Sequence, residues 1–263
     1  MKWFNLKDPR VPILIFLLSF VAYALQSPGF VRTPWQFAGS LLTSLAVDYA
    51  LIRLYKKTNF FPLSGLISSL GFFLLLDSPY VWPYIVGAAL MNISKHFFTA
   101  YDRHIFNPNN FGLVVMVFCF PMAATTTAGR WGGGTELAFI LIALGFYAAY
   151  RAQRWVLSVT YISVFFLGAL LRAHLLKLTL APLLAPMTGA AFILISFYMM
   201  TDPATSPRSK KLQVLQGVFI ASLDTYLRMQ QFKYAPFVTV FVACALYSSL
   251  RFLDQPRREL AKP

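Results

Sequence analysis

An all-α polytopic membrane protein, with about ten transmembrane helices in two inverted five-helix repeats, is the fold class that this sequence predicts. The 263 residues are 58% hydrophobic and only 12% charged, whereas about a quarter of the residues of a soluble domain are charged. The apolar residues form runs that approach the roughly 20 residues of a membrane-spanning helix. The basic residues lie in the short loops between these runs, and the two halves of the chain resemble each other.

The apolar runs divide the chain into ten expected spans within a single membrane domain, residues 1–263. The first run also resembles a signal peptide with a cleavage site after Ala22-Tyr23-Ala24, but the repeat described below requires it as a retained helix. The expected spans are residues 11–28, 36–53, 62–77, 80–97, 105–121, 136–150, 155–173, 184–201, 212–228 and 236–252.

The loop charges predict the orientation. A chain with 23 Lys and Arg against nine Asp and Glu would suggest nucleic acid as the partner of a soluble protein. Here the basic residues follow the rule that cytoplasmic loops are enriched in Lys and Arg, so we expect a bilayer, no nucleic acid, and both termini in the cytoplasm. The 17 expected inside are Lys2, Lys7, Arg10, Arg53, Lys56, Lys57, Lys95, Arg103, Arg151, Arg154, Arg208, Lys210, Lys211, Arg251, Arg257, Arg258 and Lys262, and the six outside are Arg32, Arg130, Arg172, Lys177, Arg228 and Lys233.

Short motifs recur between residues 11–121 and residues 136–252. Because each half holds five spans, an odd number, the second half would be inverted in the membrane, which favours a site near the midplane between short or broken helices. The matching pairs are PLSG at Pro62–Gly65 with PMTG at Pro186–Gly189, DSP at Asp77–Pro79 with TDP at Thr201–Pro203, and residues 107–115 with residues 234–242.

The third and fourth spans are the candidates for such broken helices. The stretch from Pro62 to Phe98 has only 37 residues, and Asp77, Ser78 and Pro79 interrupt it. Half-helices would need protein or a water-filled cavity around their free backbone groups. Two tilted full spans are the alternative.

A polar island, YDRHIFNPNN, precedes the fifth span. Asn107 before Pro108 is typical of a helix start, and Asn109 and Asn110 would lie in its first turn. The donors there favour an anion or a carbonyl. An ordinary cap with a helix–helix contact is the alternative, and spacing alone favours it.

Two further loops carry polar groups. The eighth span ends in the segment MMTDPATSPRSKK, where Asp202-Pro203 indicates a turn. The basic residues of this segment could bind a phosphate or the head group of an anionic lipid. A positive-inside loop is the simpler interpretation. The outside loop ATTTAGRWGGG holds Thr125, Thr126 and Thr127, whose hydroxyls allow phosphate contact or covalent attachment, although a plain loop is the default.

Ionisable residues inside the spans are costly and therefore candidates for function. Asp48 either lines an ion path or reaches Arg53 at the interface, and we expect Asp224 to pair with Arg228 one turn later. The two cysteines show no zinc or iron–sulfur spacing and are interpreted as small apolar fillers. The three histidines show no metal-ligand spacing either, and a proton-handling role for His96 and His104 is a weaker possibility.

KHFFTAYDRHIFNPNNFGLVV followed by MMTDPATSPRSKK resembles the membrane protein shared by two ion-pumping redox complexes, Rnf and the sodium-pumping NADH:quinone reductase. That protein is called RnfD in the first complex and NqrB in the second (the RnfD/NqrB family). The similarity extends over roughly residues 60–245, including SGLISSLGFFLLLDSP at residues 64–79. The matching residues are Lys95, Phe97, Phe98, Phe106, Asn107, Pro108, Gly112, Thr201, Asp202, Pro203, Thr205 and Pro207.

The resemblance implies a urea-transporter-like fold and flavin-linked electron transfer coupled to Na⁺ or H⁺ movement, within a bacterial inner-membrane complex containing other redox subunits. It implies FMN or riboflavin as cofactor, with residues Asn107, Pro108, Asn110, Gly112, Thr201, Asp202, Pro203 and Thr205 around a cavity. The family attaches FMN to a threonine in Ser-Gly-Ala-Thr. The corresponding loop here, residues 121–135, is shorter and lacks that motif, so this chain resembles a divergent, short member in which flavin binds noncovalently or not at all.

Two other functions are compatible with these features. A small-solute transporter or channel would use the inverted repeat and the short helices. A non-redox assembly subunit would need neither flavin nor flux. No catalytic residue is assigned, and no metal is expected.

Overall fold

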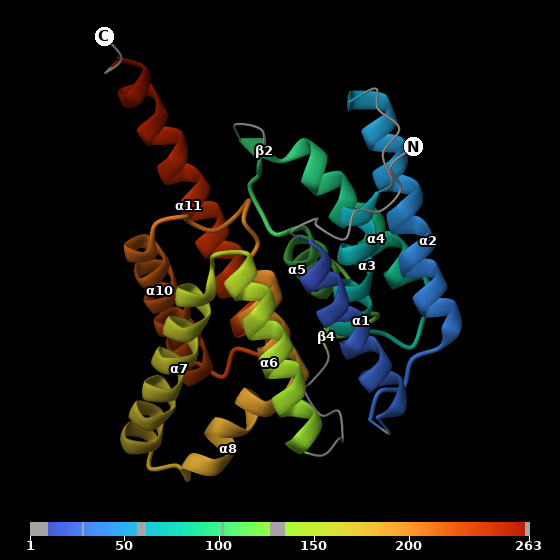
Figure 1. Ribbon diagram of the computed structural model, residues 1–263. Coiled ribbons are helices and arrows are strands. Elements are labelled where there is room, and N and C mark those ends of the chain that lie inside the picture. Colours follow the sequence, from blue (N-terminus) through green and yellow to red (C-terminus); the bar gives the residue numbers. More distant parts are fainter. Residues whose placement is uncertain (1–9, 28, 57–61, 101–102, 127–134, 261–263) are drawn as a thin grey trace.

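The computed structural model describes residues 10–27, 29–56, 62–100, 103–126 and 135–260, and most of them are helical. Figure 1 shows their helices gathered into one bundle. In the first half they are α1 (Val11–Gln26), α2 (Pro34–Leu51) with a π-helical turn (Ile52–Lys56), α3 (Leu63–Leu75), α4 (Trp82–Phe97) and α5 (Pro108–Cys119).

The second half holds a further set of helices, one of which is broken. Its elements are α6 (Thr135–Arg151), α7 (Trp155–Leu176), α8 (Leu180–Leu184) with a 3₁₀ turn (Ala185–Thr188), α9 (Ala190–Leu194) with a π turn (Ile195–Met199), α10 (Lys210–Met229) and α11 (Ala235–Leu260). Each of the ten predicted spans overlaps one of these helical segments, so the helical class is confirmed.

Helix starts follow the capping residues in the sequence. Thr33 and Gln36 form a reciprocal capping box at the start of α2. The Asn107 side chain accepts a hydrogen bond from the Asn110 N–H at the start of α5. Pro34 and Pro108 occupy first-turn positions, where a missing N–H costs nothing.

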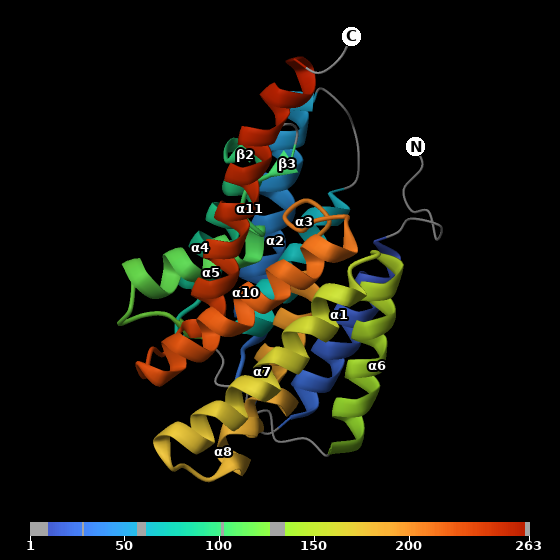
Figure 2. The ribbon, with the colours of Figure 1, turned by 90° about the vertical axis from the view of Figure 1, so that its left-hand side faces the viewer.

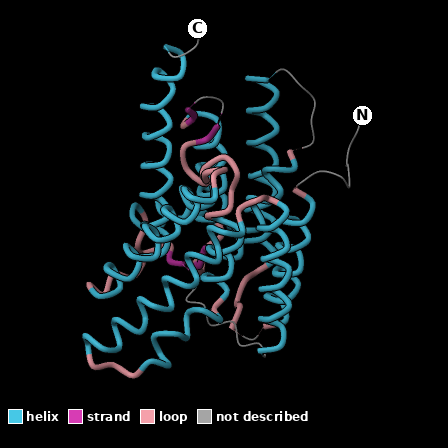
Figure 3. The backbone as a smooth tube through the Cα atoms, turned by 60° about the vertical axis from the view of Figure 1, so that its left-hand side comes forward, coloured by secondary structure: helices cyan, strands magenta, loops and turns pink. Residues whose placement is uncertain are grey.

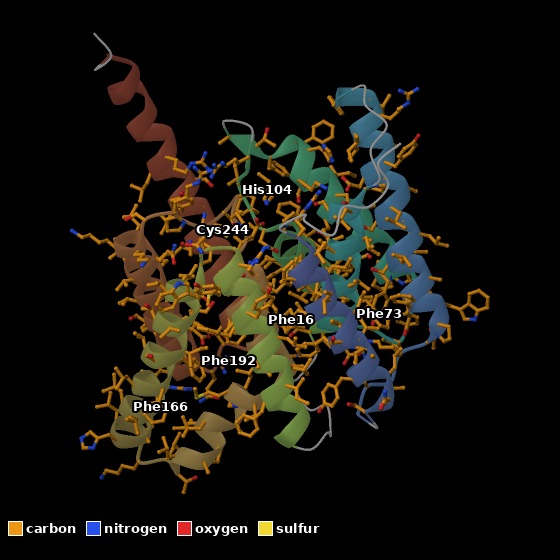
Figure 4. The ribbon with its side chains drawn as sticks, in the orientation of Figure 1. Phe16, Phe73, His104, Phe166, Phe192 and Cys244 are labelled. Atoms are coloured by element: carbon orange, nitrogen blue, oxygen red, sulfur yellow. The ribbon has the colours of Figure 1, made fainter. Side chains whose placement is uncertain are left out.

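Helices of the two halves pack in corresponding ways. α2 packs on α4 and α3, while α7 packs on α10 and α8. Across the halves, α1 lies beside α6 (Figure 2) and α5 contacts α11. The core between them includes Phe16, Phe73 and Phe192, which lie inside the bundle in Figure 4.

Within the described residues, short strands form two pairs, one in the upper part of the bundle and the other near its middle in Figure 3. β2 (Thr99–Ala100) pairs with β3 (Arg103–His104), and β1 (Leu76–Asp77) pairs with β4 (Thr125–Thr126). We call the end that holds β2 and β3 the basic end, because the loops there carry Arg103, Arg151, Arg154, Arg208 and Lys210. In Figure 1 it is the upper end, opposite α8.

Fewer helices meet the requirements of a membrane span than the ten predicted. Among the described residues, Pro34–Tyr55 and Trp155–Leu176 are long and apolar enough to cross a bilayer, and the bent pair Leu180–Thr188 and Ala190–Met199 would make a third. α3 has 13 residues and is therefore about 20 Å long, against a hydrocarbon core of about 30 Å. The ten crossings and their inverted repeat thus remain predictions.

The clearest break in a helix lies in the second half. The helices on either side of Gly189 meet at 57°, at the end of the PMTG motif that matches PLSG at the start of α3. The sequence had pointed to the third and fourth spans instead, where α3 ends as a short helix at Leu75 and Leu76 is extended. The two cysteines also differ from each other: Cys244 is buried as expected, whereas Cys119 is exposed at the end of α5, so the filler interpretation is wrong for Cys119.

Candidate functional site

The two signature motifs meet in one cavity near the basic end of the bundle. It has a volume of about 340 Å³ and lies between α1, α3, α5, α6 and the turn after α9. Five of the eight predicted cavity residues line it, together with Ser64, Ser68, His104 and Tyr198; the five are Asn107, Pro108, Thr201, Asp202 and Pro203. We call it the signature cavity.

Asn107 joins the two motifs through its side chain. Its Oδ1 caps α5 at the Asn110 N–H (3.1 Å), and its Nδ2 donates to the Met199 carbonyl (3.1 Å) and to Asp202 Oδ2 (3.4 Å). The residue is 3% exposed, so each lost partner would leave a buried polar group unsatisfied. The cap and the interhelical contact predicted for Asn107 therefore occur together.

Asp202 forms an ion pair with His104 at the mouth of the cavity. His104 Nε2 lies 2.7 Å from Asp202 Oδ2, and Figure 4 shows His104 near the upper, basic end. Burial would raise the pKa of Asp202, but the His104 ring and the hydrogen bonds from the Ala204 N–H and Asn107 outweigh it and hold the pKa below its ordinary value. Because an ionised carboxylate only accepts hydrogen bonds, His104 Nε2 carries the proton in this pair.

The loop after Asp202 is fixed by further hydrogen bonds. The Ala204 N–H donates to Asp202 Oδ1 (3.0 Å), and Ser206 Oγ donates to the Asp202 carbonyl (2.6 Å). Arg154, which is 3% exposed, donates from Nε to Ser206 Oγ (2.8 Å). This basic residue is therefore used inside the protein rather than as a free loop charge.

Tyr198 lines the cavity and is hydrogen-bonded to Asn109, which lies behind it. Asn109 Nδ2 donates to the Tyr198 hydroxyl, which in turn donates to the Ile67 carbonyl. Asn109 Oδ1 is buried and makes no hydrogen bond to any residue that the structure describes. The position of Asn109 in the first turn of α5 was predicted from the sequence, whereas the role of Tyr198 was not.

Three of the predicted cavity residues lie outside the cavity lining and stabilise the elements that form it. Asn110 Nδ2 donates to the Phe237 carbonyl on α11 (2.9 Å). At Gly112, an added Cβ would lie 3.0 Å from the Gly87 carbonyl, so this glycine lets α5 approach α4 closely. Thr205 is buried beneath the loop, 1% exposed. None of the three lines the cavity.

The threonines proposed for flavin attachment lie at the other end of the bundle. Thr125 and Thr126 form β4, and Thr125 Oγ1 lies 3.3 Å from the Tyr234 hydroxyl. Thr127 is outside the described residues. α5, with 12 residues and thus about 18 Å long, separates this loop from the signature cavity, so the two predicted flavin locations are different sites.

Asp48 forms a second buried polar cluster, on α2 and α4. Its Oδ1 accepts from Lys95 Nζ (2.6 Å) and from His96 Nε2 (2.9 Å), and the Asp48 side chain is fully buried. Its Oδ2 has no partner among the described residues and faces Gly65. The predicted alternative partner, Arg53, is exposed and forms no described pair with Asp48, so that alternative is wrong.

Asp48 ends a row of buried polar residues on α2. Gln36, Ser40, Ser44 and Asp48 recur every four residues, which places them on one face of a helix. Gln36 bonds the Ser78 carbonyl, Ser40 the Ser69 carbonyl and Ser44 the Gly65 carbonyl. Of these four residues, only Asp48 was predicted as a candidate from the sequence. The spacing of four residues between Gln36, Ser40, Ser44 and Asp48 could have predicted the others.

The remaining ionisable residue predicted inside a span, Asp224, forms a structural ion pair. Arg228 Nε lies 3.0 Å from both carboxylate oxygens of Asp224, as predicted. No group of three or more His, Cys, Asp or Glu side chains suited to a metal ion occurs within the described part of the chain.

Comparison with known proteins gives a family match in the second half of the chain. The family model of the NQR2, RnfD, RnfE family matches residues 124–242, which include the TDP motif and the threonine loop but begin after Asn107. A search of curated proteins found no match. The match and the apolar helices mark the chain as an integral membrane protein. Over residues 124–242 the chain is thus similar to the NQR2, RnfD, RnfE family.

Proposed function

We propose that the chain is a membrane subunit of an Rnf/Nqr-type electron transport system that binds a flavin noncovalently in the signature cavity. The observation that carries the proposal is the meeting of the FNP and TDP motifs at a single cavity. A cavity of about 340 Å³ lies within the range of small-molecule sites, about 300–1,000 Å³.

The cavity chemistry suits a flavin ring better than a phosphate. A flavin ring has apolar faces and a polar edge. Ile13, Ile67 and Pro108 supply apolar walls, while Ser64 and Ser68 supply hydroxyls. His104 is already paired with the Asp202 carboxylate and is therefore not available to hold a phosphate. These features favour riboflavin over FMN.

The chain's own residues would bind and orient the ring. When bound, a flavin supplies electron-transfer chemistry. Asn107 holds α5 against the TDP loop, which keeps the cavity in shape, and His104 holds a proton at Nε2 at its mouth. Pro108 and Ile13 exclude water from the ring faces.

Extraction of the purified protein tests this proposal. Acid extract separated by chromatography should contain riboflavin in near-equal amount to protein, and a denaturing gel should show no fluorescent band. A fluorescent band that is lost in Thr125→Val would move the flavin to the outer loop. Protein with no flavin in either form would reject flavin binding altogether.

We further propose that the Asp48 cluster handles the coupled ion. The Lys95 ammonium and the His96 ring contact one carboxylate oxygen of Asp48 inside a bundle, and the second oxygen, Oδ2, is left as a buried acceptor. Buried ionisable groups within membrane helices commonly mark ion or proton pathways. The row of Gln36, Ser40 and Ser44 continues from it along α2. If the proposal holds, Asp48→Asn membranes containing the complete redox system should keep electron transfer but lose Na⁺ or H⁺ uptake; unchanged uptake would contradict it.

The predicted orientation and repeat are retained as part of the proposal. Support comes from the corresponding packing of α2 on α4 and of α7 on α10. In a Cys119→Ser, Cys244→Ser background, cysteines at Gln153 and Lys177, both exposed, should react with an impermeant reagent from opposite sides of the membrane. Reaction of both from one side would overturn the topology.

Transport of a small solute is the second candidate. The 57° break at Gly189 favours it, because broken helices often form transporter sites. Solute flux into liposomes that contain the protein without a redox partner would support transport. Liposomes that remain impermeable to the solute would contradict it.

A further inference from the structure

A second cavity lies at the end of the bundle opposite the signature cavity. It has a volume of about 330 Å³ and lies where α7, α8 and α10 meet. In Figure 2 these helices converge near α8. One side of the cavity is basic, formed by Arg172, Arg228 and Lys233, and the other is apolar, with Leu176, Pro182 and Leu183.

Arg172 is the best placed of these groups to receive a ligand. The residue is 5% exposed, and its Nε donates backwards to the Gly168 carbonyl (3.4 Å) rather than to the carbonyls at the end of α7. The guanidinium also lies over the Phe165 ring, 5.7 Å from its centroid. Its NH2 group is buried and has no hydrogen-bond partner among the described residues. A guanidinium has five N–H donors in a planar fork suited to phosphate and carboxylate.

The positive charges around this cavity exceed the negative ones. Asp224 is the neighbouring carboxylate, and both of its oxygens accept from Arg228. Asp224 also attracts Arg172 electrostatically, so this single carboxylate serves both Arg172 and Arg228, and Lys233 has no carboxylate among the described residues that line the cavity. A buried arginine that shares its counter-ion is costly, and an anion in the cavity would lower that cost.

We propose that this cavity is a binding site for a phosphate-bearing anion, held by Arg172 and Lys233 and bounded by Arg228. The proposal is independent of flavin binding in the signature cavity, which lies at the other end of the bundle. The apolar wall suits the acyl chain of a phospholipid, whereas a free phosphate would use the basic side alone. Both sources share the same chemistry, the phosphate group.

Binding can be measured by thermal unfolding of the purified, delipidated protein. One arm adds mixed micelles of phosphatidylglycerol or phosphatidylcholine, and the other adds inorganic phosphate or chloride at equal ionic strength. The variants are Arg172→Gln and, because a buried substitution can impair folding, the exposed Lys233→Gln. Lys177→Gln is the matched control, since Lys177 is an exposed basic residue that does not line the cavity.

We expect phosphatidylglycerol to raise the unfolding temperature more than phosphatidylcholine does, with the midpoint concentration raised roughly tenfold in Lys233→Gln, as for the loss of one charge-assisted hydrogen bond. Arg172→Gln should abolish the shift, and Lys177→Gln should behave as wild type. A shift with inorganic phosphate alone would identify free phosphate as the source. Equal responses of wild type, Lys233→Gln and Lys177→Gln, or no response to either phosphate source, would overturn the proposal.

Discussion

Neutralising Asp48 should strongly destabilise the protein. Asp48→Asn keeps the side-chain shape but removes the charge that Lys95 Nζ contacts at 2.6 Å and His96 Nε2 at 2.9 Å. Removing one partner of a buried ion pair costs about 3–5 kcal/mol. The Lys95 side chain is 13% exposed, and its long stem can carry the ammonium toward the interface, so we expect the lower end, about 3 kcal/mol.

This loss is large enough to measure by thermal unfolding in detergent. A change of about 1 kcal/mol shifts the unfolding temperature by about 2–4 °C in chains of about 150–250 residues, so Asp48→Asn should unfold about 6–12 °C below wild type. A second substitution, Lys95→Met, should restore part of the loss, because it removes the buried ammonium along with its carboxylate.

Two results would refute this reasoning. An unfolding temperature for Asp48→Asn equal to that of wild type would mean that the pair contributes nothing net. A double variant no more stable than Asp48→Asn alone would mean that the loss arises from packing rather than from the buried charge.

Three further predictions concern the signature cavity and the contact of α2 with α3. Asn107→Leu should lower the free energy of unfolding by about 2–4 kcal/mol, because it removes the cap of α5 and leaves the buried Met199 carbonyl without its donor; thermal unfolding measures it. Because the folded-state pKa of Asp202 is depressed, its stabilisation is present above the unfolded value of about 4 and is lost as pH falls below it; acid unfolding should therefore be less steep in Asp202→Asn. Gly65→Ala should cost about 1–3 kcal/mol, because the new Cβ would lie 3.0 Å from Asp48 Oδ2; chemical unfolding measures it.

Each of these predictions has its control. Asn107→Asp keeps the cap of α5 and should lose less stability than Asn107→Leu; equal losses would contradict the assignment of the cap. His104→Gln removes the partner of Asp202 and should flatten the same acid range. Gly39→Ala would meet side-chain atoms of Ile85 and Val81 at 3.1 and 3.3 Å, which can move, so it should cost less than Gly65→Ala.

The helices could be predicted from the sequence because apolar runs and their capping residues are local signals. Asn107-Pro108 marks the start of α5, and each expected span overlaps a helix. The number of membrane crossings could not be predicted in the same way, because α3 and α5 are shorter than the thickness of the hydrocarbon core.

Partners across the bundle were harder to predict than elements along the chain. Asp224 and Arg228 pair one helical turn apart, so their spacing was sufficient. The partners of Asp48 lie 47 and 48 residues away on α4, and Asp202, in the turn that follows Met199, meets His104 on β3. Such pairs depend on how the helices pack against each other. This packing cannot be predicted from the spacing of residues along a single helix.

Flavin content in a cavity-filled variant tests the central claim most directly. Ala152 lines the signature cavity, and Ala152→Trp would occupy space that a flavin ring needs, whereas Thr125→Val alters only the distant loop that holds β4. The flavin-to-protein ratio, read from visible absorbance of purified protein, should be near one in wild type and Thr125→Val and near zero in folded Ala152→Trp. A colourless wild-type protein, or full flavin content in Ala152→Trp, would contradict the claim.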